Sequence, residues 1–237
     1  FPLQGLQPHQ WLACQRGEAE GALKVRVELP DADILDMMEV SFLRGPRTPI
    51  RDQVEEAIVD VARALNGRTM VLFTSYAQLR QTAKAIEGLL QASGLETLAQ
   101  TQGASRQQLL KRFKDLGSNS VLLGTRSFWE GVDVPGPALQ ALVIPRLPFD
   151  VPSDPIFAAR SETFENPFYE YSIPEAVLRF RQGFGRLIRR KSDEGVVIVL
   201  DKRVLTKRYG QAFLEALPPA TILRQRNNRV GEITLRW

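Results

Sequence analysis

The residues best suited to chemistry lie in the stretch 173–190, which reads IPEAVLRFRQGFGRLIRR. Its spacing predicts one helix running as far as Arg190. Gln182, Arg186 and Arg189 recur at helical intervals, so such a helix would present an amide and two guanidinium groups on one face. Two guanidinium groups beside an amide favour a polyanionic ligand such as a nucleoside triphosphate.

The opposite face of this helix is predicted to be buried. Pro174 falls in the first turn, where its missing N–H costs nothing. The apolar stripe recurs at the same helical spacing and consists of Val177, Phe180, Phe184, Leu187 and Ile188.

Two glycines, Gly183 and Gly185, lie inside the predicted helix, although each costs roughly 1 kcal/mol relative to alanine. We therefore expect some group to approach the backbone closely. The alternative interpretation of Arg189, Arg190 and Lys191 is a solvated basic face, which is the usual role of a basic run on a helix.

A second group of functional residue types occupies the loop GTRSFWEGVDVPG at 124–136. It follows a predicted buried strand, and such loops lie at the carboxyl edge of a parallel sheet, where ligands bind. Taken alone, it could equally be a polar loop that Phe128 and Trp129 anchor to the core. The loop supplies two hydroxyls, two carboxylates and two glycines that permit close approach: Thr125, Ser127, Glu130, Asp133, Gly124 and Gly131.

Apolar runs alternate with amphipathic helices from Thr48 onward, which predicts an α/β domain with a mostly parallel sheet covered by helices. Predicted strands are 69–73, 95–100, 121–124, 139–145 and 195–201, and predicted helices are 48–65, 75–93, 105–116, 173–190 and 207–217. Residues 23–29 alternate like a strand, and the last residues suggest one or two edge strands. We expect a segment of uncertain role, 1–47, packed on a domain at 48–237.

Composition narrows the classes of function. The 237 residues carry a net charge of +4 and a pI near 9.4, which favours an anionic partner. A single cysteine, Cys14, excludes an internal disulfide or a cysteine-only metal site in the monomer and suits a cytoplasmic protein. The sequence has no secretory or membrane-spanning apolar run. Because it starts at Phe1, we expect a fragment or processed product.

Four ordered motifs together resemble the second motor lobe of DinG-type helicases, bacterial relatives of the XPD repair helicase in superfamily 2. They are FTSY at 73–76, GTRSFWEGVDVPG at 124–136, RLPFDVPSDP at 146–155 and QGFGRLIR at 182–189. The resemblance extends from about residue 48 to 217 and implies a three-layer α/β/α RecA-like domain.

The resemblance also implies roles for particular residues. Arg186 and Arg189 match the arginine fingers of helicase motif VI, which argues against the solvated face. Nucleotide binding is implied for Gln182, Glu130, Gly131 and Asp133. Contacts with nucleic acid are implied for Ser75, Tyr76, Thr125 and Arg126.

Two departures qualify the match. No Gly-Lys-Ser/Thr occurs, so a phosphate-cradling P-loop is absent from these residues. Because the P-loop is absent, Asp201 after VVIVL is interpreted as structural and not as a Walker B aspartate. The four-cysteine iron–sulfur site of XPD relatives is also absent from this sequence. Both features belong to the first lobe in the family, so ATP with Mg²⁺ is expected to be bound mainly by a first lobe missing here.

The resulting hypothesis is the second RecA-like lobe of an ATP-dependent DNA helicase, inactive alone, whose partners are its first lobe and single-stranded DNA and not a membrane. The family suggests 5′→3′ polarity. A non-catalytic nucleic-acid-binding α/β module is the main alternative, and a self-sufficient transferase would need a nucleotide cradle and a catalytic base that the sequence does not display.

Overall fold

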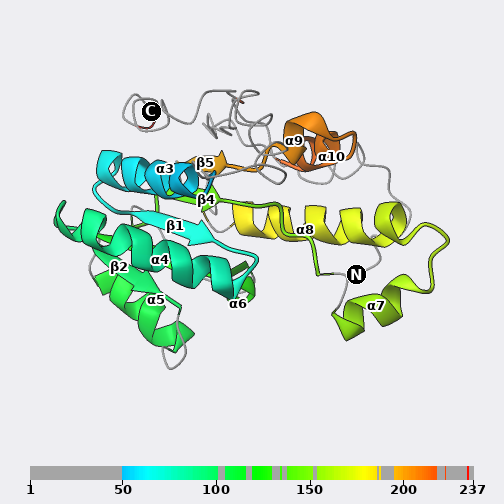
Figure 1. Ribbon diagram of the computed structural model, residues 1–237, viewed down its shortest axis with the longest axis horizontal. Helices are drawn as coiled ribbons and strands as arrows, with labels where there is room; N and C mark the ends of the chain where they lie inside the picture. The colour runs from blue at the N-terminus through cyan, green and yellow to red at the C-terminus, as the bar shows by residue number, and fades with distance from the viewer. Residues whose placement is uncertain are drawn as a thin grey trace, which may run out of the picture.

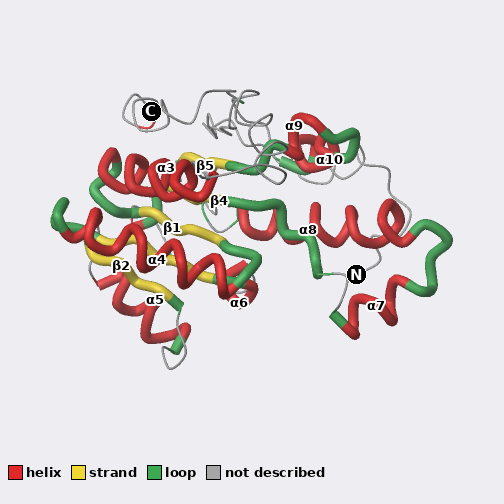
Figure 2. Tube along the Cα trace, in the orientation of Figure 1, coloured by secondary structure: helices red, strands yellow, loops and turns green. Residues whose placement is uncertain are grey.

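A five-stranded, wholly parallel sheet forms the centre of the domain (Figures 1 and 2). The computed structural model describes residues 50–100, 105–115, 119–129, 134, 138–151, 154–185, 187, 195–217, 222 and 234. The strand order is β2-β3-β1-β4-β5, and the strands are β1 (Thr69–Leu72), β2 (Glu96–Ala99), β3 (Ser120–Gly124), β4 (Ala141–Ile144) and β5 (Val196–Val199). The predicted parallel sheet is confirmed.

Helices cover both faces of the sheet, which makes the domain three-layered (Figure 1). One face packs on α3 (Ile50–Ala64) and α4 (Tyr76–Gln91). The other packs on α5 (Arg106–Asp115), α6 (Arg126–Trp129), α8 (Ile173–Phe184) and α10 (Gly210–Glu215), with α9 (Arg203–Thr206) just before α10. Because both faces are buried, neighbouring residues of one strand enter opposite cores, as Val71 and Leu72 of β1 do.

Local signals in the sequence set the helix ends on the first face. The α3 helix stops at a turn in which Asn66 and Gly67 have φ of 51° and 86°, a left-handed conformation that asparagine and glycine tolerate best. The α4 helix begins after Ser75, whose hydroxyl accepts a hydrogen bond from the N–H of Gln78. Both boundaries confirm the sequence-based prediction.

The α8 helix is shorter than predicted. It ends at Phe184, and Gly185 caps it by donating its N–H to the carbonyl of Arg181. Two glycines within three residues lower helix propensity, which accounts for an end before the predicted Arg190. Of the predicted buried stripe, Phe180, Phe184 and Leu187 are buried and Val177 is partly buried, while Ile188 lies outside the described residues.

The segment between β4 and α8 contains elements that the sequence analysis did not predict. Helix α7 (Pro155–Ser161) starts after Asp154, whose carboxylate accepts the N–H groups of Ile156 and Phe157. A single π-helical turn (Phe168–Ser172) then leads into α8. Ring-to-ring contacts fix this segment against the α10 region and join Phe149, Phe168, Tyr209, Phe213 and Phe180.

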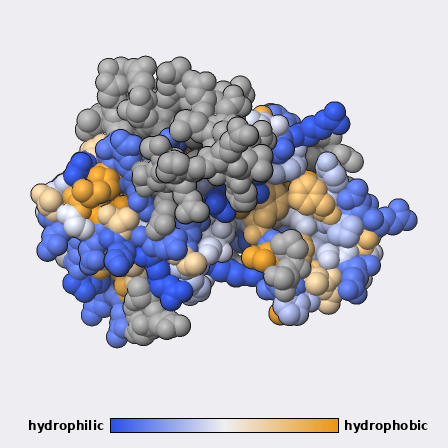
Figure 3. Space-filling model, in the orientation of Figure 1, coloured by the Kyte–Doolittle hydropathy of each residue, from blue (hydrophilic) through white to orange (hydrophobic). Residues whose placement is uncertain are grey.

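Hydrophilic residues cover much of the face seen in Figure 3, with apolar patches toward its two ends. Segment 1–47, residues 48 and 49 of α3's predicted start and the predicted strand at 23–29 lie outside the described residues. The same holds for nearly all of the predicted edge strands near the carboxyl terminus.

Candidate functional site

Polar residues follow the strands at the carboxyl edge of the sheet, where ligands bind in open parallel folds. Ser75 comes after β1, Gln100 after β2 and Thr125 after β3. Asp150 follows β4, and Asp201 follows β5. The candidate site is therefore assembled from loops distant in sequence and adjacent in the sheet.

Ser75 and Tyr76 form the outer part of this edge. Both side chains are exposed, Tyr76 to 51% of its surface. Ser75 caps α4, so its hydroxyl oxygen already accepts one backbone hydrogen bond. The phenol of Tyr76 accepts a hydrogen bond of 2.9 Å from the side-chain amide of Gln100. The two residues predicted to contact nucleic acid thus lie on the surface, and hydrogen bonds to Gln78 and Gln100 position their side chains.

Gln100 joins three loops of the edge. Its Oε1 accepts hydrogen bonds of 2.8 Å from both the backbone N–H and the hydroxyl of Thr125. Its Nε2 donates to Tyr76 Oη at 2.9 Å and to Ser127 Oγ at 3.0 Å. Gln100 is only 9% exposed and Thr125 only 3%, so this amide lies beneath the surface and ties it together. Gln100 was not identified from the sequence, although a polar residue at the carboxyl end of a predicted strand is a detectable signal.

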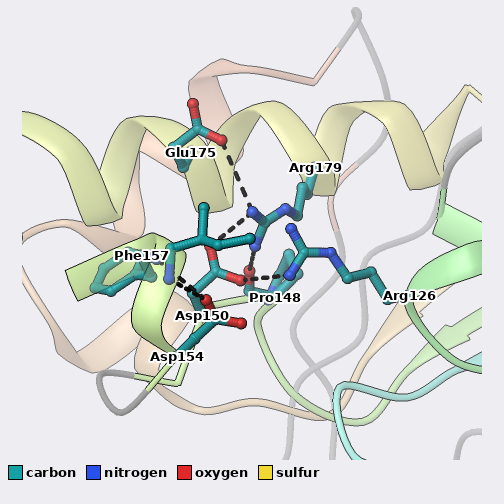
Figure 4. A network of polar contacts seen from close by, with 8 residues as sticks. Arg126, Pro148, Asp150, Asp154, Phe157, Glu175 and Arg179 are labelled. Carbon is teal, nitrogen blue, oxygen red and sulfur yellow. Dashed lines mark hydrogen bonds and ion pairs between the residues drawn. The ribbon is translucent and has the colours of Figure 1, made fainter. Parts of the chain in front are cut away.

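Arg126 is held from the other side by Asp150 (Figure 4). Arg126 Nη1 lies 3.2 Å from Asp150 Oδ1, and its side chain is 63% exposed while that of Asp150 is only 10% exposed. Arg179 of α8 donates to the second carboxylate oxygen at 2.6 Å and lies 3.8 Å from Glu175. One partly buried carboxylate is thus shared by an exposed and a partly buried arginine, which orients Arg126 outward. Neither Asp150 nor Arg179 was identified from the sequence.

Asp201 makes hydrogen bonds within the protein, in line with the structural role predicted for it from the sequence. Its carboxylate accepts the backbone N–H of Leu147 at 2.8 Å. It also accepts a bidentate pair from the guanidinium of Arg203, with Nε 3.0 Å from Oδ1 and Nη2 2.6 Å from Oδ2. The hydrogen bond that Arg203 donates to Asp201 raises the pKa of Arg203, while partial burial of the guanidinium opposes this rise. Asp201 therefore ties the loop after β4 to the loop after β5.

Trp129 and Gly183, which precede the candidate nucleotide residues 130–133 and 186–189 in the sequence, are in contact. Trp129 is buried, and its indole lies so close to Gly183 of α8 that a Cβ there would be 2.8 Å from ring atoms Cε3 and Cζ3. The indole N–H donates to the carbonyl of Phe73 at 3.3 Å. The expected close approach to the glycine-containing helix is thus found at Gly183, and the approaching group is a tryptophan of the protein itself. Around Gly185 the nearest atoms to a Cβ are 3.5 and 3.6 Å away.

Of the predicted nucleotide residues, Gln182 lies on α8 and is partly exposed. Arg186 and Arg189 follow the end of α8, while Glu130, Gly131 and Asp133 follow Trp129, and all five lie outside the described residues. Phe128 and Trp129 are both buried, so the anchoring part of the alternative interpretation of this loop is confirmed.

Within the described ranges, no helix is both long and apolar enough to cross a membrane. Those same ranges bring together no group of three or more histidine, cysteine, aspartate or glutamate residues that could hold a metal ion.

Residues 58–220 match the family described as the helicase C-terminal domain, and this match covers more than half of the chain. The chain belongs to this family. The resemblance to DinG-type and XPD-related helicases is confirmed, and the RecA-like assignment of the fold with it.

Individual relatives of this helicase C-terminal domain carry helicase and exonuclease names. The "3'-5' exonuclease DinG" of Bacillus subtilis (strain 168) is 44% identical over 167 residues, which are 68% of this chain and 18% of that protein. The "ATP-dependent DNA helicase YoaA" of Haemophilus influenzae is 42% identical over 226 residues, which are 90% of this chain and 34% of that protein. The chain thus spans about a third or less of the length of these relatives.

A solved XPD helicase structure has the same fold. It superimposes with a TM-score of 0.60 at 18% sequence identity, over 88% of this chain and 36% of the XPD chain.

Proposed function

We propose that this helicase C-terminal domain is the second motor lobe of an ATP-dependent DNA helicase and completes an ATP site together with a first lobe. The observation that carries the proposal is the packing of Trp129 on Gly183. Glu130 directly follows the tryptophan, and Arg186 lies three residues after the glycine. Trp129 and Gly183, which precede the two candidate nucleotide segments in the sequence, are therefore in contact.

The chemistry of the available residues fits one half of a site for ATP with Mg²⁺. Arginine and glutamine side chains can contact phosphate oxygens, but the sequence lacks the Gly-Lys-Ser/Thr that cradles them. Gln182, Glu130, Gly131 and Asp133 are the residues we propose to contact nucleotide from this side. The phosphates and the metal ion would be held mainly by the first lobe.

Arg186 and Arg189 are proposed to act as arginine fingers across the cleft between the lobes. Charge accumulates on the γ-phosphate oxygens in the transition state of phosphoryl transfer, and guanidinium groups that neutralise it contribute about 10³–10⁵ in rate. Supplying them from the lobe opposite the P-loop makes hydrolysis depend on closure. The opening and closing of the lobes would then move the enzyme along its DNA.

Single-stranded DNA is proposed to pass over the carboxyl edge at Ser75, Tyr76 and Arg126, with Thr125 directly beneath. The exposure of these side chains, the buried groups that orient them and the excess of basic residues support this surface. The polarity proposed for translocation is 5′→3′, on family resemblance alone. We propose a cytoplasmic protein.

A steady-state ATPase assay separates this proposal from a self-sufficient enzyme. The purified chain 1–237 is expected to hydrolyse no ATP, with or without single-stranded DNA, because half of the site is lacking. DNA-stimulated turnover by the chain alone would contradict the proposal. A non-catalytic binding module would instead leave ATPase of the full-length protein unaffected when Arg186 or Arg189 is replaced.

A further inference from the structure

The side-chain amide of Gln100 can be oriented in only one way. The backbone N–H of Thr125 is a donor without acceptor capacity, and it lies 2.8 Å from one terminal atom of Gln100. That atom must be the carbonyl oxygen, because an NH₂ group there would put two donors in contact. The other terminal atom is therefore the NH₂ group, which only donates.

The position of this NH₂ group decides how two hydroxyls behave. Tyr76 Oη and Ser127 Oγ lie 2.9 and 3.0 Å from Nε2, so each must accept one of its two protons. Each hydroxyl therefore keeps its own proton for another partner. Within the described part of the chain, neither hydroxyl has an acceptor in range. Both oxygens are close neighbours, because they share one nitrogen.

Thr125 behaves in the opposite way. Its hydroxyl is 2.8 Å from Gln100 Oε1, an atom that only accepts, so its proton is already used. Thr125 is also almost completely buried. Its hydroxyl and N–H thus fix the glutamine and are not directed at a ligand.

We propose that Gln100 is a positioning residue that presents the hydroxyls of Tyr76 and Ser127 as paired donors to phosphate oxygens of a nucleic-acid backbone. This inference rests on the proposed DNA-binding surface and adds Ser127 to it. Anionic oxygens accept hydrogen bonds strongly, and phosphate contacts of this kind fix the strand without reading its sequence. Arg106 of α5, which donates to the carbonyl of Ser127 at 2.9 Å, brings a positive charge to the same place.

The substitution Gln100→Glu tests this arrangement with little change in shape. The carboxylate can still accept both hydrogen bonds from Thr125. Its second oxygen is an acceptor, so the hydroxyls of Tyr76 and Ser127 must turn their protons inward. Binding of a fluorescein-labelled oligothymidylate to chain 1–237, followed by anisotropy at low salt, is expected to weaken on the order of tenfold, as for losing one or two charge-assisted hydrogen bonds. Tyr76→Phe and Ser127→Ala should each weaken it by about threefold or more.

The added negative charge of Gln100→Glu would by itself repel DNA, so the substitution is repeated in a Tyr76→Phe/Ser127→Ala background. Action through the hydroxyls predicts a markedly smaller loss in this background than in the wild type. An equal loss in both backgrounds would overturn the proposal, as would wild-type affinity in both hydroxyl variants. If Gln100→Glu fails to fold by circular dichroism, the single hydroxyl variants decide alone. Absence of oligothymidylate binding by the wild-type chain would instead contradict the proposed DNA-binding surface itself.

Discussion

Replacing Gly183 by alanine tests the contact from which the two candidate nucleotide segments start. An alanine Cβ at this position would lie 2.8 Å from two ring carbons of Trp129 and 3.3 Å from Cδ1 of Leu72. Carbon atoms attract at separations of about 3.5–4.0 Å, so the new methyl group would be in repulsive contact with the ring. Trp129 is only 2% exposed and has little room to move.

Two opposing effects set the magnitude. Alanine in a helix is favoured over glycine by about 0.5–1 kcal/mol, and the gain is at the low end here because Gly183 is one residue from the end of α8. Overpacking of a buried site costs about 1–3 kcal/mol. We therefore expect Gly183→Ala to lower the free energy of unfolding by roughly 1–2 kcal/mol.

Urea unfolding measures this difference, and Gly88→Ala is the matched control. Gly88 lies in α4 with nothing within 4 Å of a Cβ, so alanine there should raise the free energy of unfolding by about 0.5–1 kcal/mol. The double variant Gly183→Ala/Trp129→Phe should lose less than the sum of its two single changes, because both act on one contact. A Gly183→Ala protein as stable as the Gly88→Ala protein would refute the packing argument.

Three further outcomes follow from the described contacts. Asp201→Ala should lower the free energy of unfolding, measured in urea, by about 2–3 kcal/mol, which is more than Arg203→Met should. The alanine variant removes the acceptor for the N–H of Leu147 and leaves the partly exposed guanidinium of Arg203 without its carboxylate. Burial raises the pKa of the Asp60 carboxyl above 3.8, although the charge of Arg63 opposes this rise, so the contribution of Asp60 to stability falls as the pH rises from 3.8 through the raised pKa. The Asp60→Asn variant should therefore be more stable than the wild type at neutral pH but not below pH 3.8. An equal gain in the free energy of unfolding at the two pH values would refute this explanation. Binding of single-stranded DNA should weaken steeply with salt, at about 0.7 units of log–log slope per phosphate, and Arg126→Gln should reduce that slope in a fluorescence titration.

The sequence predicted the parts of the fold that depend on local pattern. Each of the five predicted strands contains or overlaps an observed one, and the end of α3 and the cap of α4 lie where asparagine, glycine and serine predict them. Strand order is a property of pairing between distant segments, so the sequence did not provide it. The α7 helix left a usable signal, Asp154 followed by Pro155, in the preferred order of an N-cap and a first helical residue.

The candidate site shows the same division. Tyr76, Thr125 and Arg126 were identified because the resemblance implies a role for each. Gln100 lies outside the four motifs, and Asp150 lies in RLPFDVPSDP without an implied role, so their contacts with these residues were not predicted. The glycines of α8 predicted a close approach, which is found at Gly183, but a helical pattern does not reveal that the approaching group is a tryptophan 54 positions earlier. Such partners become visible only when the loops at the carboxyl edge are brought together.

The kcat for ATP hydrolysis by the full-length protein carrying Arg189→Ala, with Arg186→Ala in parallel, shows whether this domain completes the ATP site with arginine fingers. Arg190→Ala is the matched control, since it removes the same charge from the neighbouring position outside the Gln-x-x-Gly-Arg-x-x-Arg pattern. We predict that kcat falls by at least about 10²-fold in both Arg186→Ala and Arg189→Ala and that lysine at either position does not restore it. The melting temperatures of these variants, and the kcat of Arg190→Ala, should remain near the wild-type values. Near wild-type kcat in both Arg186→Ala and Arg189→Ala would contradict the assignment of this domain as the lobe that completes the ATP site.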